Sequence, residues 1–518
     1  MMNIFFNLLH ILRSISKEQI LIYPGNIKIP LHIKIIGYIL TLIFSPLSLI
    51  KKPREDFGKR LTNCLQQLGP IYIKFGQTLS TRPDLVGLDV TKHLKFLQDK
   101  LPPFDSRVAR GLVQKAFQSQ YHSRSYQGHS RESGNPENNS HPEFISGSIM
   151  RCGKLVQHDK EKLDSRLRGN DIKRDENDIE HFDDTPIAAA SISQVHKAQL
   201  ITGEFVAIKI LRPDIHQKYN RDIKLLYFLA KLASKFTKLK RLKPLAVIRK
   251  FRETMKHELD LRLEAAAASE LTDNFRNDLD ICIPKIYWQF TSENILTTEW
   301  VDGISIYETH KLKELGLNLS VIAQKFAVMF FNQAYRDGFF HADLHPGNIL
   351  VNEQGKIILL DFGIMGRLTE KDRLAVAESL FGFLNRDYKL VAKTHLKAGY
   401  IPANTDLDLF AQSCRAVTEP IVGLATKNIS VGKLLAHLFK ITEDFGMEVQ
   451  PQLLLLQKTL VMVEGIGQQL DTNVNMWQLA EPWIQKWAAK NLSPEAKILR
   501  IVKHYIEELY NKIEGYSK

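Results

Sequence analysis

The chain of 518 residues has few cysteines, no long uninterrupted apolar run and no secretory signal. Its four cysteines lie far apart and form no CxxC pair, which argues against a disulfide scaffold or structural zinc and indicates a reducing compartment. Residues Met1 to Arg13 are apolar but lack the early basic region and the small-residue cleavage site of a signal peptide.

The apolar run from Ile35 to Ile50 is shorter than the roughly 20 residues that cross a bilayer, and it contains Pro46. A basic segment, Lys51 to Arg54, follows it directly. The pattern favours a buried helix, and the basic flank leaves a membrane-surface element open.

The composition, with 44% hydrophobic and 25% charged residues, is that of a folded globular protein with room for two lobes and extensions. The net charge of +13 is spread along the chain, and no zinc-finger, homeodomain or aromatic RNA-binding signature occurs. We therefore expect no nucleic-acid partner. A basic surface held near anionic lipid explains the charge.

The segment HADLHPGN places Asp343 and Asn348 five residues apart, and Asp361 opens a DFG triplet downstream. Between them, residues 349–352 and 356–360 have the β-branched, apolar pattern of a hairpin that brings Asp361 back beside Asn348. Phosphoryl transfer uses one carboxylate to orient or deprotonate the acceptor, and an amide oxygen and a second carboxylate to hold the metal. The spacing predicts Asp343 in the first role and Asn348 and Asp361 as metal ligands.

His341, Asp343 and His345 alternate along this segment, so a zinc site is conceivable. The run from Asp343 to Pro346 is more typical of a rigid turn, which argues against metal ligation by the two histidines.

A second candidate site precedes this one in the chain. Small residues between two predicted strands let backbone N–H groups approach phosphates, although a protein kinase has glycines where this loop has alanines. The following strand carries VAIK, whose Lys209 suits the α/β-phosphates. The predicted nucleotide-binding residues are Ile187, Ala188, Ala189, Ala190, Ser191, Ile192, Ser193, Gln194, Val195 and Lys209.

A long helix is predicted around residues 247–271, and it carries Glu258, Asp260 and Glu264. At about 100° per residue, Asp260 and Glu264 lie nearly on one face and Glu258 on another, so one carboxylate can pair with Lys209 while another meets a different partner. The alternative is an exposed acidic helix paired with its own arginine.

Thr297 to Gly303 should end a strand and link the two lobes, where an adenine ring would bond to the backbone. After the DFG triplet the chain enters a predicted helix, residues 369–384, with no activation segment ending in APE. The remainder is predicted to be amphipathic helices at 407–417, 431–445, 453–470 and 496–513.

Near the N-terminus, helical spacing from Phe57 to Leu68 is followed by Gly69-Pro70 and a second predicted helix, residues 71–80. On that helix Lys74 and Gln77 share a face, and Gly76 allows another backbone to approach closely. Taken alone, this is a solvated polar face.

Residues 121–181 are rich in Ser, Asn, Gly, Arg and His, and they lack hydrophobic periodicity. We predict a disordered insertion, with an electrostatic partner-binding loop as the alternative. The predicted domains are therefore an N-terminal helical extension (1–120), the insertion (121–181), an N-lobe (182–300) and a C-lobe with a helical extension (301–518).

These motifs, in this order, resemble those of the UbiB family of atypical kinase-like proteins, linked to ubiquinone biosynthesis, and in particular its bacterial branch. The resemblance covers nearly the whole chain outside the insertion. It rests on KxGQ (Lys74 to Gln77), the Ala-rich loop, VAIK, ExD (Glu258 and Asp260) with the following EA, HADLHPGN and DFG.

The resemblance implies an α+β, bilobal protein-kinase-like fold, with an N-terminal helical extension carrying KxGQ and a helical C-terminal lobe. It also implies binding of ATP or ADP with Mg2+. The KxGQ helix, with Lys74 and Gln77 on one face, would cover the active site, and Glu258 and Asp260 would contact this helix. Lys209 would contact the phosphates, and Glu264 would form its ion pair.

The function implied is an ATPase or atypical kinase that supports ubiquinone biosynthesis. Its partners would be a membrane lipid or quinone precursor and the biosynthetic enzymes, at the cytoplasmic face of the bacterial inner membrane. Bacterial relatives commonly end in a membrane-spanning segment, whereas Ile498 to Lys518 is predicted to be a polar amphipathic helix. We therefore expect peripheral attachment through the N-terminal region, the basic surface or a partner.

Two other functions stay open. A small-molecule phosphotransferase of the aminoglycoside-kinase type also uses an HxDxHxxN segment, although KxGQ and ExD argue against it. A nucleotide-gated scaffold without turnover is the second, and the intact Lys209, Asp343, Asn348 and Asp361 favour chemistry over it.

Overall fold

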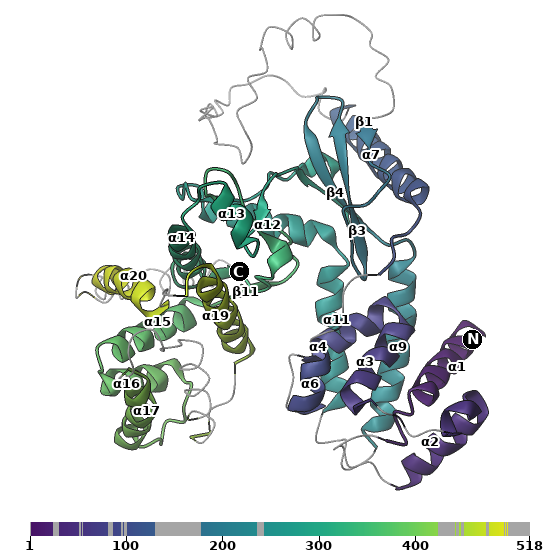
Figure 1. Cartoon of the computed structure of the whole chain (residues 1–518), viewed down its shortest axis with the longest axis horizontal. Helices are drawn as coiled ribbons and strands as arrows, with labels where there is room; N and C mark the ends of the chain where they lie inside the picture. Colours follow the sequence, from purple (N-terminus) through teal and green to yellow (C-terminus); the bar gives the residue numbers. More distant parts are fainter. Residues whose placement is uncertain are drawn as a thin grey trace, which may run out of the picture. The chain divides into compact units, whose positions relative to one another are not determined.

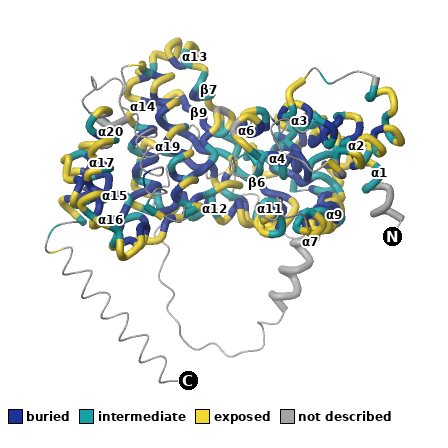
Figure 2. The backbone as a smooth tube through the Cα atoms, turned by 90° about the horizontal axis from the view of Figure 1, so that it is seen from below, coloured by how far each residue is buried: buried dark blue, intermediate teal, exposed yellow. Residues whose placement is uncertain are grey.

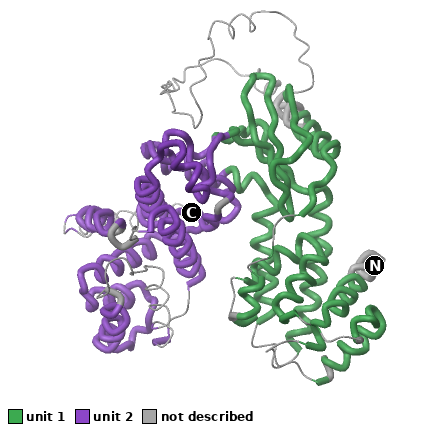
Figure 3. The backbone as a smooth tube through the Cα atoms, viewed as in Figure 1, with its two compact units in different colours: residues 1–144, 159–265, 285–300 green, residues 145–158, 266–284, 301–518 purple. Residues whose placement is uncertain are grey.

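A computed structural model describes residues 2–23, 31–50, 53, 55–80, 86–94, 97, 101–129, 178–235, 243–422, 441, 445–446, 450–472, 476–491, 493 and 495. The fold is α+β and kinase-like. The described residues divide into two compact units (Figure 3). Unit 1 takes its residues from 1–144, 159–265 and 285–300, and unit 2 from 266–284 and 301–518.

Unit 1 combines helices with one antiparallel sheet (Figure 1). The helices at the predicted KxGQ region begin and end as the sequence indicates, because Gly69 has a φ of 104° and Pro70 starts the second helix. The helices are α1 (Met2–Lys17), α2 (Leu31–Phe44), the 3-10 helix η1 (Pro46–Ile50), α3 (Phe57–Leu68), α4 (Pro70–Ser80), α6 (Leu88–Leu94), α7 (Ser106–His129), α9 (Ile215–Ala233) and α11 (Pro244–Glu258).

The sheet of unit 1 has the strand order β1-β3-β4-β6, and β2 pairs with β3. Its strands are β1 (Ile179–Phe182), β2 (Ala188–Ala189), β3 (Ser193–Leu200), β4 (Phe205–Leu211) and β6 (Ile295–Glu299). Along β4, Val206, Ile208 and Ile210 are fully buried in a cluster with residues of α7, and Lys209 points to the opposite face. The buried neighbours on either side fix the backbone of β4 at Lys209.

The single helix predicted for residues 247–271 is wrong. The structure has two helices, α11 and α12 (Leu261–Asn274), and a break at Asp260. Two competing hydrogen bonds end the first helix. The N–H of Leu261 donates to the carbonyl of Glu293, 2.9 Å away, and the Asp260 carboxylate accepts from the N–H of Arg262.

Both borders of the predicted insertion, residues 121–181, also differ from expectation. Helix α7 continues to His129, and β1 begins at Ile179, where it pairs with Leu200 on the edge of β3. Regular backbone hydrogen bonds therefore replace disorder at the two ends. Residues 130–177 lie outside the described part of the chain.

The buried helix favoured for residues 35–50 is wrong as well. α2 and η1 occupy this run, and most of its large apolar side chains are exposed, among them Leu42 at 63% and Leu47 at 79%. Among the described residues, no helix is long and apolar enough to cross a membrane.

Unit 2 holds two small sheets and a set of helices. The predicted hairpin is confirmed, since β9 (Ile349–Val351) and β10 (Ile357–Leu359) pair in antiparallel fashion with Leu359 opposite Ile349. The other strands are β5 (Ile281–Cys282) and β7 (Ile304–Ser305) beside this hairpin, and β8 (Phe339–His341) paired with β11 (Met365–Arg367).

Of the helices predicted in this part of the chain, those at 369–384, 407–417 and 453–470 are confirmed, and the structure adds helices that were not predicted. Thr369 caps α15 by accepting from the N–H of Asp372, as expected for a helix that starts soon after DFG. The helices are α13 (Thr309–Glu314), α14 (Leu319–Phe331), the π-helical η3 (Asn332–Asp337), α15 (Glu370–Leu384), α16 (Tyr388–Ala398), α17 (Leu407–Val422), α19 (Pro451–Leu470) and α20 (Met476–Asn491). The predicted helix at 431–445 lies largely, and that at 496–513 wholly, outside the described residues.

Cys64 and Cys414 are free and buried, in line with the spacing of the cysteines. Cys282, at the end of β5, is disulfide-bonded, contrary to the expectation from the spacing of the cysteines.

Candidate functional site

The first group of site residues lies in unit 1, around Lys209. The Lys209 ammonium lies 2.9 Å from each carboxylate oxygen of Glu264, and the side chains are 19% and 9% exposed. Glu264 stands in the first turn of α12, where the helix dipole favours a carboxylate. A lysine held this way keeps its cation at a fixed point on the sheet, as the predicted ion pair requires.

The Ala-rich loop is the turn between β2 and β3, closed by a bond from the N–H of Ala190 to the carbonyl of Ser193. Arg212, just after β4, holds this turn. Its Nε and Nη2 lie 3.1 and 2.8 Å from the carbonyl oxygen of Ala190. The backbone N–H of Arg212 donates to the carbonyl of Ile192. The same guanidinium donates to the carbonyl of Pro102 at 2.9 Å. One side chain therefore joins the loop to the segment that precedes α7.

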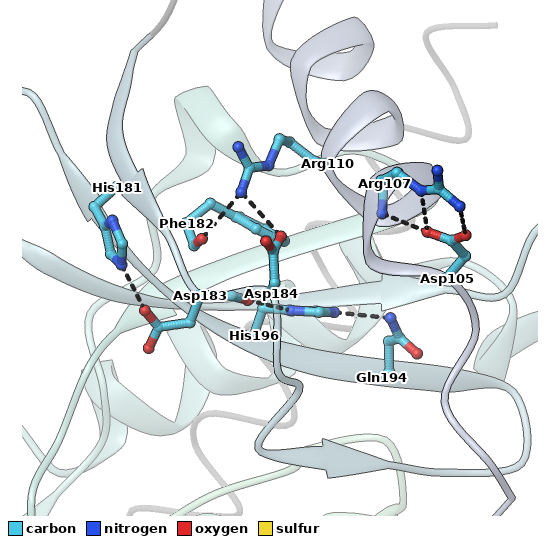
Figure 4. A network of polar contacts seen from close by, with 9 residues as sticks. All are labelled: Asp105, Arg107, Arg110, His181, Phe182, Asp183, Asp184, Gln194 and His196. Atoms are coloured by element: carbon cyan, nitrogen blue, oxygen red, sulfur yellow. Dashed lines mark hydrogen bonds and ion pairs between the residues drawn. The ribbon is translucent and has the colours of Figure 1, made fainter.

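Gln194 makes a second connection between the same two segments. Its side-chain oxygen accepts from the N–H of Phe104 at 2.9 Å, and its amide nitrogen donates to Nε2 of His196 at 2.8 Å (Figure 4). Nδ1 of His196 then donates to the carbonyl of Asp183. Burial lowers the pKa of His196, which suits the neutral form that this chain of bonds requires. The Gln194 side chain is thus buried, where it positions the loop.

The KxGQ residues on α4 have three different local contacts. Lys74 lies 3.1 Å from the carboxylate of Glu258 at the end of α11, and both side chains are nearly buried, at 14% and 11%. Gln77 donates to the carbonyl of Leu97 at 3.4 Å. A Cβ at Gly76 would lie 2.3 Å from a methyl of Leu97, so glycine allows this packing, but the close neighbour is a side chain and not the backbone that was predicted. The solvated polar face is therefore not what the structure has.

Asp260 pairs with Arg262 instead of the KxGQ helix. The guanidinium reaches both carboxylate oxygens, at 2.9 and 2.8 Å, and this bonding lowers the pKa of Asp260. The resemblance implied a contact between Asp260 and the KxGQ element, and the pairing with Arg262 takes its place. The break at Asp260 turns its side chain to the start of α12.

The second group of site residues lies in unit 2, around His341 at the end of β8. His341 is fully buried, its Nδ1 accepts from the N–H of Asp343 at 3.2 Å, and its Nε2 donates to the carbonyl of Leu360 at 3.0 Å. Its own N–H donates to the side-chain oxygen of Gln333, which η3 positions. Burial lowers the pKa of His341. The neutral ring therefore joins the segment of Asp343 to that of Asp361.

Asn348 bonds back to the same turn. Its amide nitrogen donates to the backbone carbonyl of Asp343 at 3.0 Å, and its own carbonyl accepts from the N–H of Leu360. Because the nitrogen is engaged, the side-chain oxygen of Asn348 is the atom suited to a cation. The Asp343 side chain itself is half-buried.

Asp361 has an exposed side chain and a left-handed φ of 57°. Aspartate tolerates this region better than most residues, and its carboxylate accepts from the N–H of Gly363 at 3.3 Å. Phe362 packs its ring on His341, with centroids 5.7 Å apart. The DFG triplet is thus anchored by its phenylalanine while the aspartate faces outward.

The donors in unit 2 fit Mg2+ better than zinc. Asn348 and Asp361 offer oxygens, which hard cations prefer. Both ring nitrogens of His341 are engaged, and Nδ1 of His345 accepts from the N–H of Gly347. Within the described ranges no group of three or more His, Cys, Asp or Glu residues is placed to hold a metal.

Three supporting residues were missed from the sequence. Arg212, His196 and Gln333 carry no motif, and their contacts join segments 8 to 110 residues apart. Only the position of Arg212, three residues after Lys209 and directly after β4, offered a signal, because a residue leaving β4 is brought beside the hairpin turn.

Comparison with known proteins agrees with these motifs. The ABC1 atypical kinase-like domain matches residues 154–395, and the UbiB helical domain matches residues 414–475. A curated "Probable protein kinase UbiB" from Marinobacter nauticus is 37% identical over 467 residues, covering 89% of this chain and 76% of the relative.

Proteins of the same name from other bacteria align at similar levels. That of Vibrio cholerae is 38% identical over 448 residues, covering 85% of this chain and 72% of the relative. That of Azotobacter vinelandii is 36% identical over 475 residues, covering 91% and 78%. With such identity over most of both sequences, the chain belongs to the UbiB family of atypical kinase-like proteins.

Proposed function

We propose that this protein is an ATP-dependent atypical kinase or ATPase that supports ubiquinone biosynthesis. Membership of the UbiB family supports the kinase-like class, and the family name points to the ubiquinone pathway. The observation that carries the proposal is the contact of both Glu264 oxygens with the Lys209 ammonium, because a nearly buried cation held on a strand is what phosphate binding needs.

In unit 1, Lys209 would contact the α- and β-phosphates of ATP or ADP, and Glu264 would hold the lysine in place. The loop Ile187 to Val195 would cap the nucleotide with backbone N–H groups, and Arg212 and Gln194 would keep that loop in shape.

In unit 2, Asn348 and Asp361 would hold Mg2+ through oxygen atoms. Magnesium, when bound, would neutralise negative charge on the phosphates. Asp343 would accept the proton of the acceptor hydroxyl or orient a water molecule. The hydrogen bond from the N–H of Asp343 to His341 would keep this carboxylate in position without adding a positive charge.

Lys74, Gln77 and Glu258 would regulate the reaction. Lys74 on α4 and Glu258 on α11 form a nearly buried ion pair. Separating the two would leave each charge without its partner, which is costly, so the pair can hold α4 in one arrangement. Asp260, assigned by resemblance to the same group, would act indirectly by fixing the junction between α11 and α12.

The phosphoryl acceptor would be a lipid or quinone precursor, or an enzyme of the pathway. The protein would work at the cytoplasmic face of the inner membrane as a peripheral protein. The net charge of +13 supports attraction to anionic lipid.

The test is Mg2+-dependent ATP binding and turnover by purified protein, compared with Asp361→Asn. Asparagine suits the left-handed φ of this position, so the fold should persist while the metal ligand is lost. We expect thermal stabilisation by Mg-ATP in the wild type and little in the variant. Equal stabilisation of both proteins would refute the assignment of Asp361. Binding without turnover, with or without anionic membranes and quinone-precursor mimics, would favour the scaffold alternative.

A further inference from the structure

Helix α2 of unit 1 packs on its neighbours through its small side chains. Gly37 and Thr41, one turn apart, are buried, and the Thr41 hydroxyl donates to the carbonyl of Gly37 at 2.8 Å. A Cβ at Gly37 would lie 2.7 Å from Cβ of Leu21. α1 and α2 lie side by side (Figure 1), so the glycine lets α2 approach the chain that follows α1.

The large apolar side chains of α2 point the other way. At about 100° per residue, they centre on the side opposite Gly37 and Thr41. Figure 2 shows exposed positions along this helix. The exposed residues are Leu31 (74%), Ile35 (50%), Ile36 (49%), Tyr38 (48%), Ile39 (52%), Leu42 (63%) and Ile43 (63%), with Leu47 (79%) in η1.

This arrangement reverses that of an ordinary surface helix, which buries its large apolar side chains and exposes polar ones. A contiguous exposed apolar face of this kind marks an interaction site. We call the eight exposed residues the α2 face.

The basic residues that flank α2 in the sequence indicate what covers the α2 face. From Gln19 to Arg54 the chain has no aspartate or glutamate and five basic residues: Lys28, Lys34, Lys51, Lys52 and Arg54. An apolar helix flanked by basic residues suits an anionic lipid surface. A symmetric pairing with a second copy would bring two sets of these basic residues together, which opposes it.

The length of the helix excludes crossing. Fourteen residues span about 21 Å, less than the roughly 30 Å of a hydrocarbon core. The α2 face can therefore enter only one side of the membrane, with the helix lying along the interface.

We propose that the α2 face inserts into the surface of a membrane containing anionic phospholipid and holds unit 1 there. The inference deepens the proposed membrane setting but does not depend on nucleotide chemistry, because no residue of the α2 face belongs to the candidate site.

The test is flotation of the full chain with vesicles of phosphatidylcholine alone or mixed with phosphatidylglycerol. We expect the triple variant Ile39→Ser, Leu42→Ser, Ile43→Ser to lower the vesicle partition coefficient about tenfold or more. The matched control, Phe228→Ser, Leu232→Ser, Leu315→Ser, removes similarly exposed apolar residues elsewhere (58%, 46% and 46%) and should bind as the wild type does.

Charge is tested with Lys34→Glu, Lys51→Glu, Lys52→Glu, which should weaken binding to the anionic vesicles more than to neutral ones. A tryptophan placed by Leu42→Trp should be quenched by brominated lipid when vesicles are added. ATP binding measured on the same samples separates this inference from the proposed function, since the serine variant should keep it.

Three results would overturn the proposal: unchanged partitioning of the serine triple variant, an equal loss in the matched control, or absence of quenching at residue 42. A concentration-dependent dimer that the serine variant dissociates, with vesicle binding unchanged, would assign the α2 face to a second copy instead.

Discussion

Nε2 of His341 donates a hydrogen bond to the carbonyl oxygen of Leu360, 3.0 Å away, and Leu360 directly precedes Asp361. The other ring nitrogen accepts from the N–H of Asp343. A protonated ring could not accept that bond, so the arrangement requires a neutral imidazole. Burial favours the neutral form and lowers the pKa of His341.

Three buried histidines predict a loss of stability in mild acid. Burial lowers the pKa of His395 to about 4, and lowers those of His341 and His196. The unfolded chain, with histidine pKa values near 6.5, takes up protons at a higher pH than the folded chain does. The contribution of these histidines to the free energy of unfolding is therefore fully present above about pH 6.5 and is lost as the pH drops toward 4. Chemical denaturation between pH 8 and 4.5 should show this decline.

The histidine assignment is checked with His395→Phe, which keeps an aromatic ring near Tyr400 and Phe410. This variant should reduce the pH dependence of the free energy of unfolding by about 1.4 kcal/mol per pH unit below pH 6, the value for one proton. An unchanged slope in the His395 variant would contradict the assignment.

Lys209 and Glu264 should separate stability from nucleotide binding. Lys209→Met leaves a nearly buried carboxylate without its cation, which should cost about 3 kcal/mol. Adding Glu264→Gln should restore much of this stability but no ATP binding, because the phosphate-binding cation is still missing. Urea unfolding and calorimetric titration measure the two quantities. Recovery of ATP binding in the double variant would rule out Lys209 as the phosphate ligand.

The Lys74–Glu258 pair should restrain phosphoryl transfer. We expect Lys74→Ala and Glu258→Gln each to keep nucleotide binding, to increase labelling by radioactive ATP and to impair ubiquinone synthesis in cells, since either change breaks the same contact. Gln77→Ala removes only the long bond to Leu97 and serves as the milder comparison. If both pair variants lose stability but show wild-type labelling and quinone levels, the pair is packing alone.

Arg212 should control the shape of the Ala-rich loop. Arg212→Lys keeps the charge but cannot reproduce the fork that reaches Ala190 and Pro102 together. We expect ATP affinity to fall about three- to tenfold, with a loss of stability of about 1 kcal/mol. Arg276→Lys, in an exposed pair with Asp273, is the control. Unchanged ATP affinity in the Arg212 variant would show that the contacts of Arg212 with the Ala-rich loop do not contribute to nucleotide binding.

Local patterns in the sequence determined the elements and the candidate residues. The Gly69-Pro70 junction, the 349–359 hairpin and the strand around Lys209 depend on turn chemistry and on alternation, which act over a few residues. The Lys209–Glu264 and Lys74–Glu258 pairs were expected from the motifs that this chain shares with the UbiB family.

The tertiary structure decided the features that depend on distant residues. The helix predicted for 247–271 breaks because Leu261 bonds to Glu293, and Asp260 turns to Arg262 as a result. α2 exposes its apolar side because its opposite side packs against Leu21 through Gly37. A residue larger than glycine would not fit there. Periodicity records which side chains share a face, but which face is buried depends on contacts made by residues far away in the chain.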